Sequence, residues 1–241
     1  MLIGEDFDKI QFELFGLHLG EPNAFIGDTL IFIVALIIAK KIKRLGLNTP
    51  FLSNWYWFIL IFGFGFGFFV GGLGHLFFNY TGIPGKYPAL YLGIVSAVFI
   101  EKAMISLYPK ESIRKILNQL VFIKLALALI AATFVFSFVD LYKDQSVALL
   151  VTSVNAAIGS IYAVGYLGIK YVRTISPSFH YIWIGVLLFI PTAVVQSNKI
   201  NLHQWFDRND VSHVLIIASM ILYYNGINKF SQKINTEAES I

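Results

Sequence analysis

Seven long apolar segments, separated by short polar connections, dominate this sequence. Each has the roughly 20 residues that an α-helix needs to cross the hydrocarbon core of a bilayer. The helices of a soluble protein would carry a polar face, whereas these segments are apolar nearly all round. We therefore predict an all-α integral membrane bundle of seven transmembrane helices. The predicted spans are Ala24–Ile42, Asn54–Asn79, Pro88–Tyr108, Ile113–Val139, Ser146–Val172, Ser178–Gln196 and Val211–Lys229.

The composition agrees with a membrane protein and excludes several other classes. Of the 241 residues, 57% are hydrophobic and only 13% are charged, whereas about a quarter of a soluble domain is charged. The net charge is +4, but the basic residues lie between apolar runs instead of on one face. This pattern excludes nucleic acid and leaves membrane lipid as the expected partner. The absence of cysteine excludes disulfides and thiolate chemistry.

The connections between spans differ in charge, and this difference predicts the orientation. Lys and Arg gather after the first, third, fifth and seventh spans, so these connections should be cytoplasmic. We therefore expect an extracytoplasmic N-terminal segment at 1–23, a transmembrane domain at 24–230 and a short, disordered cytoplasmic tail at 231–241. The lack of a targeting signal and the residue usage favour a cell membrane, most simply a bacterial inner membrane. The basic residues are Lys40, Lys41, Lys43, Arg44, Lys110, Arg114, Lys115, Lys170, Arg173, Lys229 and Lys233.

Two local patterns predict how particular spans are shaped. Pro191 lies inside the sixth span and should kink it. In the second span Gly63, Gly67, Gly71 and His75 follow one another at intervals of four and form a stripe on one helix face. Small residues allow a neighbouring backbone to approach, so this stripe should pack against other helices and direct His75 into the bundle.

Polar residues at the outer ends of the spans are candidates for a functional site. Asp28, His75, Asn209, Asp210 and His213 should lie at one depth, and the last three share a helix face. Two imidazoles and one or two carboxylates could hold Zn²⁺ with an activated water. The alternative is structural: the histidine hydrogen-bonds a neighbouring helix and Asp210 caps the last span.

A second polar group lies deeper in the membrane. Glu101 in the third span and Lys124 in the fourth could form an ion pair across adjacent helices. Asn155 in the fifth span could either hydrogen-bond a neighbouring helix or line a pocket. We favour structural pairing for this group.

The pattern of spans and outer residues resembles the CREST superfamily of alkaline ceramidases and adiponectin or progestin receptors. The residues that carry the resemblance are the Gly71-Gly72-x-x-His75 run, Asp28 and the stretch Asn209-Asp210-x-x-His213. Together with Glu21-Pro22 they look like an uncharacterised bacterial branch of that superfamily. The resemblance implies a zinc ion held by one histidine of the second span and two of the last, on the side of the N-terminus.

Carried onto this chain, the resemblance assigns three metal positions, of which one departs from the pattern. His75 matches the first ligand and His213 the last, but the middle position holds Asn209. A neutral amide oxygen suits Ca²⁺ or Mg²⁺ better than Zn²⁺. The resemblance also implies a serine four residues before the first histidine, and here that position holds Gly71. Asp28 or Asp210 is then the candidate for completing the site as a catalytic group.

These observations support two functional hypotheses. The first is a metal-dependent hydrolase of a lipid amide or ester, which would bind Zn²⁺ at the outer membrane boundary and use metal-bound water as the nucleophile. The second is a non-enzymatic seven-span protein that has lost the catalytic residues and binds a lipid or small solute as a sensor, carrier or partner subunit. A transporter is a third alternative, which only Asn155, Pro191 and the Glu101 and Lys124 pair favour.

Overall fold

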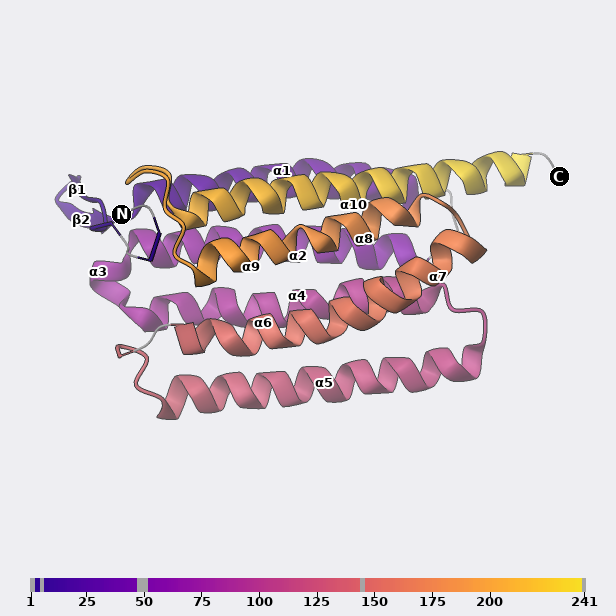
Figure 1. Ribbon diagram of the computed structural model, residues 1–241, viewed down its shortest axis with the longest axis horizontal. Helices are drawn as coiled ribbons and strands as arrows, with labels where there is room; N and C mark the ends of the chain where they lie inside the picture. The colour runs from indigo at the N-terminus through magenta and orange to yellow at the C-terminus, as the bar shows by residue number, and fades with distance from the viewer. Residues whose placement is uncertain (1–2, 5–6, 47–51, 144–145, 240–241) are drawn as a thin grey trace.

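The computed structural model describes residues 3–4, 7–46, 52–143 and 146–239 of the chain, and most of them are helical (Figure 1). A small antiparallel sheet precedes the helices. In chain order the elements are β1 (Gln11–Leu14), β2 (Leu17–Gly20), α1 (Pro22–Gly46), α2 (Leu52–Leu76), α3 (Phe78–Thr81), η1 (Ile83–Lys86), α4 (Tyr87–Ser106), α5 (Glu111–Phe138), α6 (Ser146–Ser160), η2 (Ile161–Tyr166), α7 (Leu167–Thr174), α8 (Phe179–Leu187), α9 (Phe189–Ser197) and α10 (Arg208–Glu239).

The prediction of seven transmembrane spans is confirmed. In the described part of the chain, seven helical stretches are long and apolar enough to cross a membrane. They run side by side, and the two termini lie at opposite ends of the bundle, as an odd number of spans requires (Figure 1). The spans are Pro22–Leu45, Ser53–Leu76, Ile83–Ser106, Glu111–Phe138, Val147–Thr174, Phe179–Ser197 and Arg208–Glu237.

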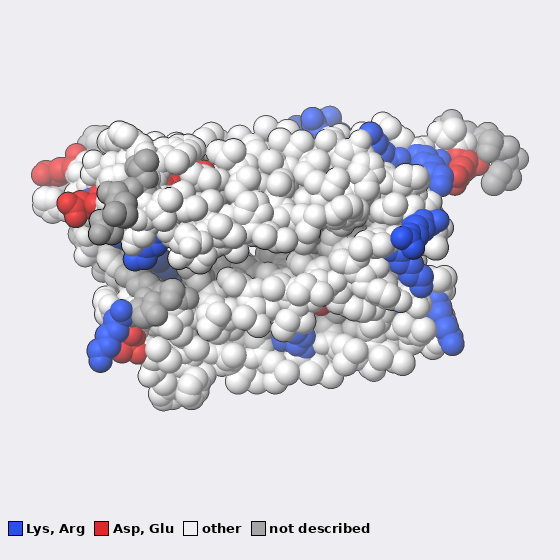
Figure 2. Space-filling view, in the orientation of Figure 1, with Lys and Arg blue, Asp and Glu red and all other residues white. Residues whose placement is uncertain are grey.

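Charged groups gather at the two ends of the molecule (Figure 2). Lys and Arg predominate at the end that carries the C-terminus, whereas Asp and Glu are more frequent at the end with the N-terminus. This distribution is the one that the basic connections predict, so we call the end with the N-terminus the outer end.

Helix α2 lies at the centre of the packing, between α1 and α4. Its glycine stripe allows this, as predicted. A Cβ atom on Gly67 would lie 3.4 Å from the Cβ of Leu92, and one on Gly71 would lie 3.5 Å from the Cβ of Ala89, both in α4. Helix α10 packs against α1, α8 and α9, whereas α5 lies at the edge, against α4 and α6.

Two spans depart from a continuous α-helix. The sixth divides into α8 and α9 at Leu188, three residues before Pro191, because proline has no N–H to donate to the preceding turn. The division lies beside the proline where the kink was predicted. The fifth contains a π-helical segment, η2, between α6 and α7, which the sequence pattern did not indicate.

The N-terminal segment folds over the outer end of the bundle. Strands β1 and β2 form a hairpin in which Gln11 pairs with Gly20. Asn79 donates its Nδ2 hydrogen to Gln11 Oε1 at 2.8 Å, and the His18 backbone N–H donates to the Tyr80 hydroxyl, also at 2.8 Å. These bonds attach the hairpin to the segment that follows α2, so it forms a cover for that end.

The C-terminal tail differs from its prediction. Residues 231–239 continue α10 instead of being disordered. Phe230 and Ile234 pack on the main hydrophobic core, and Lys233 Nζ lies 3.7 Å from Glu237 Oε1 one turn further on. Such contacts stabilise a terminal helix that the polar composition alone does not reveal. The last part of the predicted tail, 240–241, lies outside the described residues.

Candidate polar site at the outer end

The centre of the outer polar group is His213, near the start of α10. Its Nε2 lies 3.0 Å from Asp28 Oδ1 on α1, and its Nδ1 lies 3.9 Å from Asp210 Oδ1 one turn earlier. All three side chains are about nine-tenths buried. The Nδ1 atom is buried and has no hydrogen-bond partner among the described residues. The structure therefore brings together three of the predicted residues.

Hydrogen bonds and close packing with neighbouring residues hold Asp210 and His213 in place. Asp210 Oδ2 accepts hydrogen bonds of 3.0 Å from Asn23 Nδ2 and from the Asp207 backbone N–H. Helix α1 passes so close to His213 that a Cβ atom on Gly27 would overlap the imidazole ring. The glycine directly before Asp28 thus makes room for the histidine with which Asp28 pairs.

His75 belongs to a separate pair. Its Nδ1 lies 2.8 Å from Glu21 Oε2, and Glu21 Oε1 lies 3.0 Å from Lys9 Nζ. Burial acts to raise the pKa of Glu21, but the hydrogen bond with His75 and the positive charges of His75 and Lys9 outweigh burial and lower that pKa from 4.5 to about 2. His75 therefore helps to hold the N-terminal segment.

Asn209 lies in a third hydrogen-bonded group. Its Oδ1 accepts a hydrogen bond of 3.2 Å from Gln196 Nε2, at the end of α9. The same Gln196 nitrogen lies 3.0 Å from Ser212 Oγ. The amide oxygen that would serve as a metal ligand is thus engaged in joining α9 to α10.

The three predicted metal ligands each contact a different side chain: His75 contacts Glu21, Asn209 contacts Gln196 and His213 contacts Asp28. The described residues contain no group of three or more His, Asp or Glu side chains that could hold a metal ion. The residues present do not fit the three-ligand zinc centre that the CREST resemblance implies. Zinc binding therefore stays a prediction.

The deeper polar group forms as predicted. Lys124 Nζ lies 2.6 Å from Glu101 Oε1, which gives the expected ion pair between α4 and α5. The ammonium also donates to Asn155 Oδ1 at 2.9 Å and to the Asn155 carbonyl at 3.0 Å. Asn155 Nδ2 in turn donates to the Ile94 carbonyl at 3.1 Å. This group joins α4, α5 and α6.

Sequence reasoning missed the partners that complete the outer groups. Glu21 and Asn23 stand in a stretch that indicates a helix start, and Gln196 stands at the end of a span, so none was assigned a site role. The one local signal is Gly27 directly before Asp28, since a small residue beside a buried carboxylate leaves space for a partner side chain.

Comparison with known proteins gives one match. Residues 24–232 match the model of a protein family described as a family of unknown function, DUF6962. No curated protein matches the chain, and no solved structure matches it. The likeness to the CREST superfamily therefore stays a prediction.

Proposed function

The chain belongs to the family of unknown function DUF6962, and we propose that it is a non-enzymatic membrane protein that binds a small ammonium-bearing solute or lipid headgroup at its outer end. The observation that carries this proposal is the buried group of His213, Asp28 and Asp210, whose imidazole Nδ1 has no hydrogen-bond partner among the described residues.

The charges of this group favour a cationic ligand. An imidazole carries at most one positive charge, whereas Asp28 and Asp210 carry two negative charges when both are ionised. An uncompensated charge is costly in a buried site, so a cation bound beside the two carboxylates would lower the free energy. An ammonium group supplies that charge together with hydrogen-bond donors.

The cover formed by the N-terminal hairpin supports a binding role. Glu21 connects strand β2 to helix α1, and its contact with His75 attaches this connection to α2. A ligand that reaches the His213 group from outside would first meet this cover. Movement of the hairpin could then report ligand binding, as a sensor requires, or admit the ligand, as a carrier requires.

The hydrolase hypothesis makes a different prediction about metal. If it holds, the purified chain should contain about one Zn²⁺, and His75→Ala and His213→Ala should each remove it. That result would overturn the binding proposal. Zinc-free protein, or zinc that both variants retain, would oppose the hydrolase.

The binding proposal is tested by thermal unfolding of the full chain in an uncharged detergent with increasing ethanolamine. A ligand at ten times its dissociation constant stabilises the folded state by about 1.4 kcal/mol. We expect a rise in Tm for the unmodified chain and none for Asp28→Asn. Asp140→Asn is the matched control, because the exposed Asp140 carboxylate pairs with Lys143 and accepts a hydrogen bond from the Tyr142 backbone N–H, away from the His213 group.

Two further experiments test whether the ammonium group is required and whether a lipid supplies it. Glycerol at the same concentrations lacks the ammonium group and should leave Tm unchanged. Bilayer discs of phosphatidylethanolamine, compared with discs of phosphatidylglycerol, test whether a lipid supplies the amine. An equal rise in Tm for Asp28→Asn, or no rise with either ethanolamine or phosphatidylethanolamine, would contradict the proposal.

A further inference from the structure

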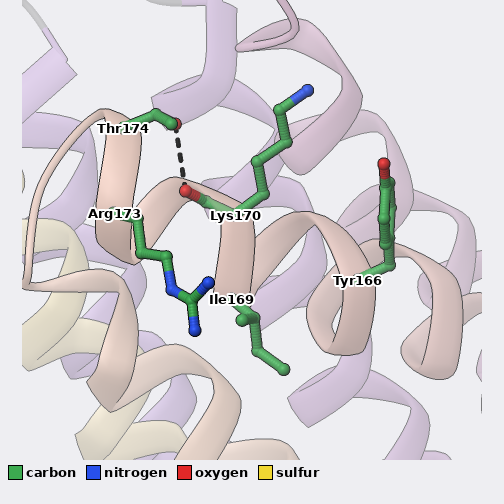
Figure 3. A pocket seen from close by; sticks show the side chains of 5 residues that line it. All are labelled: Tyr166, Ile169, Lys170, Arg173 and Thr174. Carbon is green, nitrogen blue, oxygen red and sulfur yellow. Dashed lines mark hydrogen bonds between the residues drawn. The ribbon is translucent and has the colours of Figure 1, made fainter.

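A second candidate site lies at the opposite end of the bundle, where η2 continues into α7. A recess of about 290 Å³ is lined by Tyr166, Ile169, Lys170, Arg173 and Thr174, which we call the inner recess. Figure 3 shows these side chains on consecutive turns, with the Lys170 ammonium and the Arg173 guanidinium pointing in different directions. The two residues therefore supply separate positive charges at the edges of the recess.

The two cations of the inner recess have no carboxylate partner in the described part of the chain. Neither Lys170 nor Arg173 lies within 4.0 Å of a described carboxylate, whereas Lys115 and Lys233 each have one, Glu111 and Glu237 respectively. Lys170 Nζ lies 4.5 Å from the centre of the Tyr108 ring, a contact that orients the ammonium without cancelling its charge. The inner recess is therefore electropositive and suited to bind an anion.

The apolar part of the recess indicates that the anion belongs to a lipid. Tyr166 and Ile169 lie on the membrane-facing side of the span, with 61% and 50% of their surfaces exposed. Tyr162 stacks on Tyr166, with ring centres 6.1 Å apart. Aromatic rings at the membrane boundary sit at the level of the headgroups. A soluble anion would leave this apolar surface exposed, whereas a phospholipid would cover it with an acyl chain.

The π-helical segment supplies the shape of this surface. Segment η2 ends at Tyr166, the first residue that lines the recess. Its wider turn changes the direction in which the following side chains leave the helix, and π-helical turns occur frequently at functional sites. We propose that the inner recess binds the phosphate headgroup of an anionic phospholipid from the cytoplasmic leaflet.

The proposal is tested by native mass spectrometry of the delipidated full chain, titrated with phosphatidylglycerol in detergent. Each basic residue near an anionic headgroup contributes about 1 kcal/mol, so the Lys170→Gln and Arg173→Gln double variant should bind roughly 30-fold more weakly. The control is the Lys40→Gln and Lys43→Gln double variant. It removes the same number of positive charges from α1, at the same end of the bundle as the inner recess. It should bind within about threefold of the unmodified chain.

Three outcomes would overturn the proposal. Equal weakening in the control would show general attraction by net charge, and no weakening in the double variant would exclude the inner recess. Binding of soluble glycerol phosphate as strong as that of the lipid would replace the lipid by a free anion. A charge-preserving exchange, Lys170→Arg with Arg173→Lys, separates these results from misfolding, because it should retain phosphatidylglycerol binding.

Discussion

Replacing Lys124 by Met should destabilise the bundle strongly, because it leaves a carboxylate without its partner inside the membrane. The Lys124 ammonium forms an ion pair with Glu101 Oε1 at 2.6 Å and donates hydrogen bonds to two oxygen atoms of Asn155, the backbone carbonyl and Oδ1. The Glu101 side chain is only 5% exposed, so water cannot take the place of the ammonium.

The magnitude follows from the loss of one partner in a buried ion pair. Removing one member of such a pair costs about 3–5 kcal/mol, whereas replacing both members by neutral groups is close to neutral. Lys124→Met should therefore lower the free energy of unfolding by about 4 kcal/mol. Adding Glu101→Gln should recover most of this loss and leave a deficit of about 1 kcal/mol from interhelical hydrogen bonds.

The assay is reversible unfolding of the full chain in mixed micelles with increasing sodium dodecyl sulfate. Lys102→Met is the matched control, because Lys102 is adjacent to Glu101 but contacts the rings of Tyr56 and Phe122. It should cost about 1 kcal/mol. A loss for Lys124→Met no larger than that of this control, or a double variant that Glu101→Gln does not restore, would contradict the buried ion pair as the source of this stability.

Three other predictions follow from the same geometry. Gly27→Ala should displace the His213 ring and abolish any ethanolamine-dependent rise in Tm, while circular dichroism shows an intact helical fold. Gly159→Ala would place a Cβ atom 2.5 Å from Glu101 Oε1 and should cost about 1–3 kcal/mol by overpacking, measured by detergent unfolding. The folded-state pKa of Glu21 is lowered from 4.5 to about 2, so its contribution of about 3 kcal/mol is present above pH 4.5 and is lost as the pH falls towards 2. A titration of stability should show this loss for the unmodified chain and not for Glu21→Gln.

Much of the fold could be predicted because the constraint is local. A stretch of about 20 apolar residues must be helical in a bilayer, where no water can satisfy the backbone. The seven spans and the break near Pro191 followed from this and from the geometry of proline. The π-helical segment η2 did not, because its residues form an ordinary apolar run.

The candidate sites could be predicted only in part. Residue spacing placed Asp210 and His213 on one face of one helix, and the charges of Glu101 and Lys124 at similar depth predicted their pairing. Membrane depth alone could not show whether His75 and His213 belong to one site or to two separate pairs. In the structure His75 pairs with Glu21, which precedes the first span, whereas His213 pairs with Asp28.

The sequence by itself determined the number of spans, since hydropathy acts on single segments, and the charge of the connections predicts their orientation. The tertiary structure decided which residues meet. Pairing of His213 with Asp28 depends on the rotation of α1 and α10 about their axes and on the close approach that Gly27 permits. These quantities arise from packing between segments distant in the chain, so no local pattern contains them.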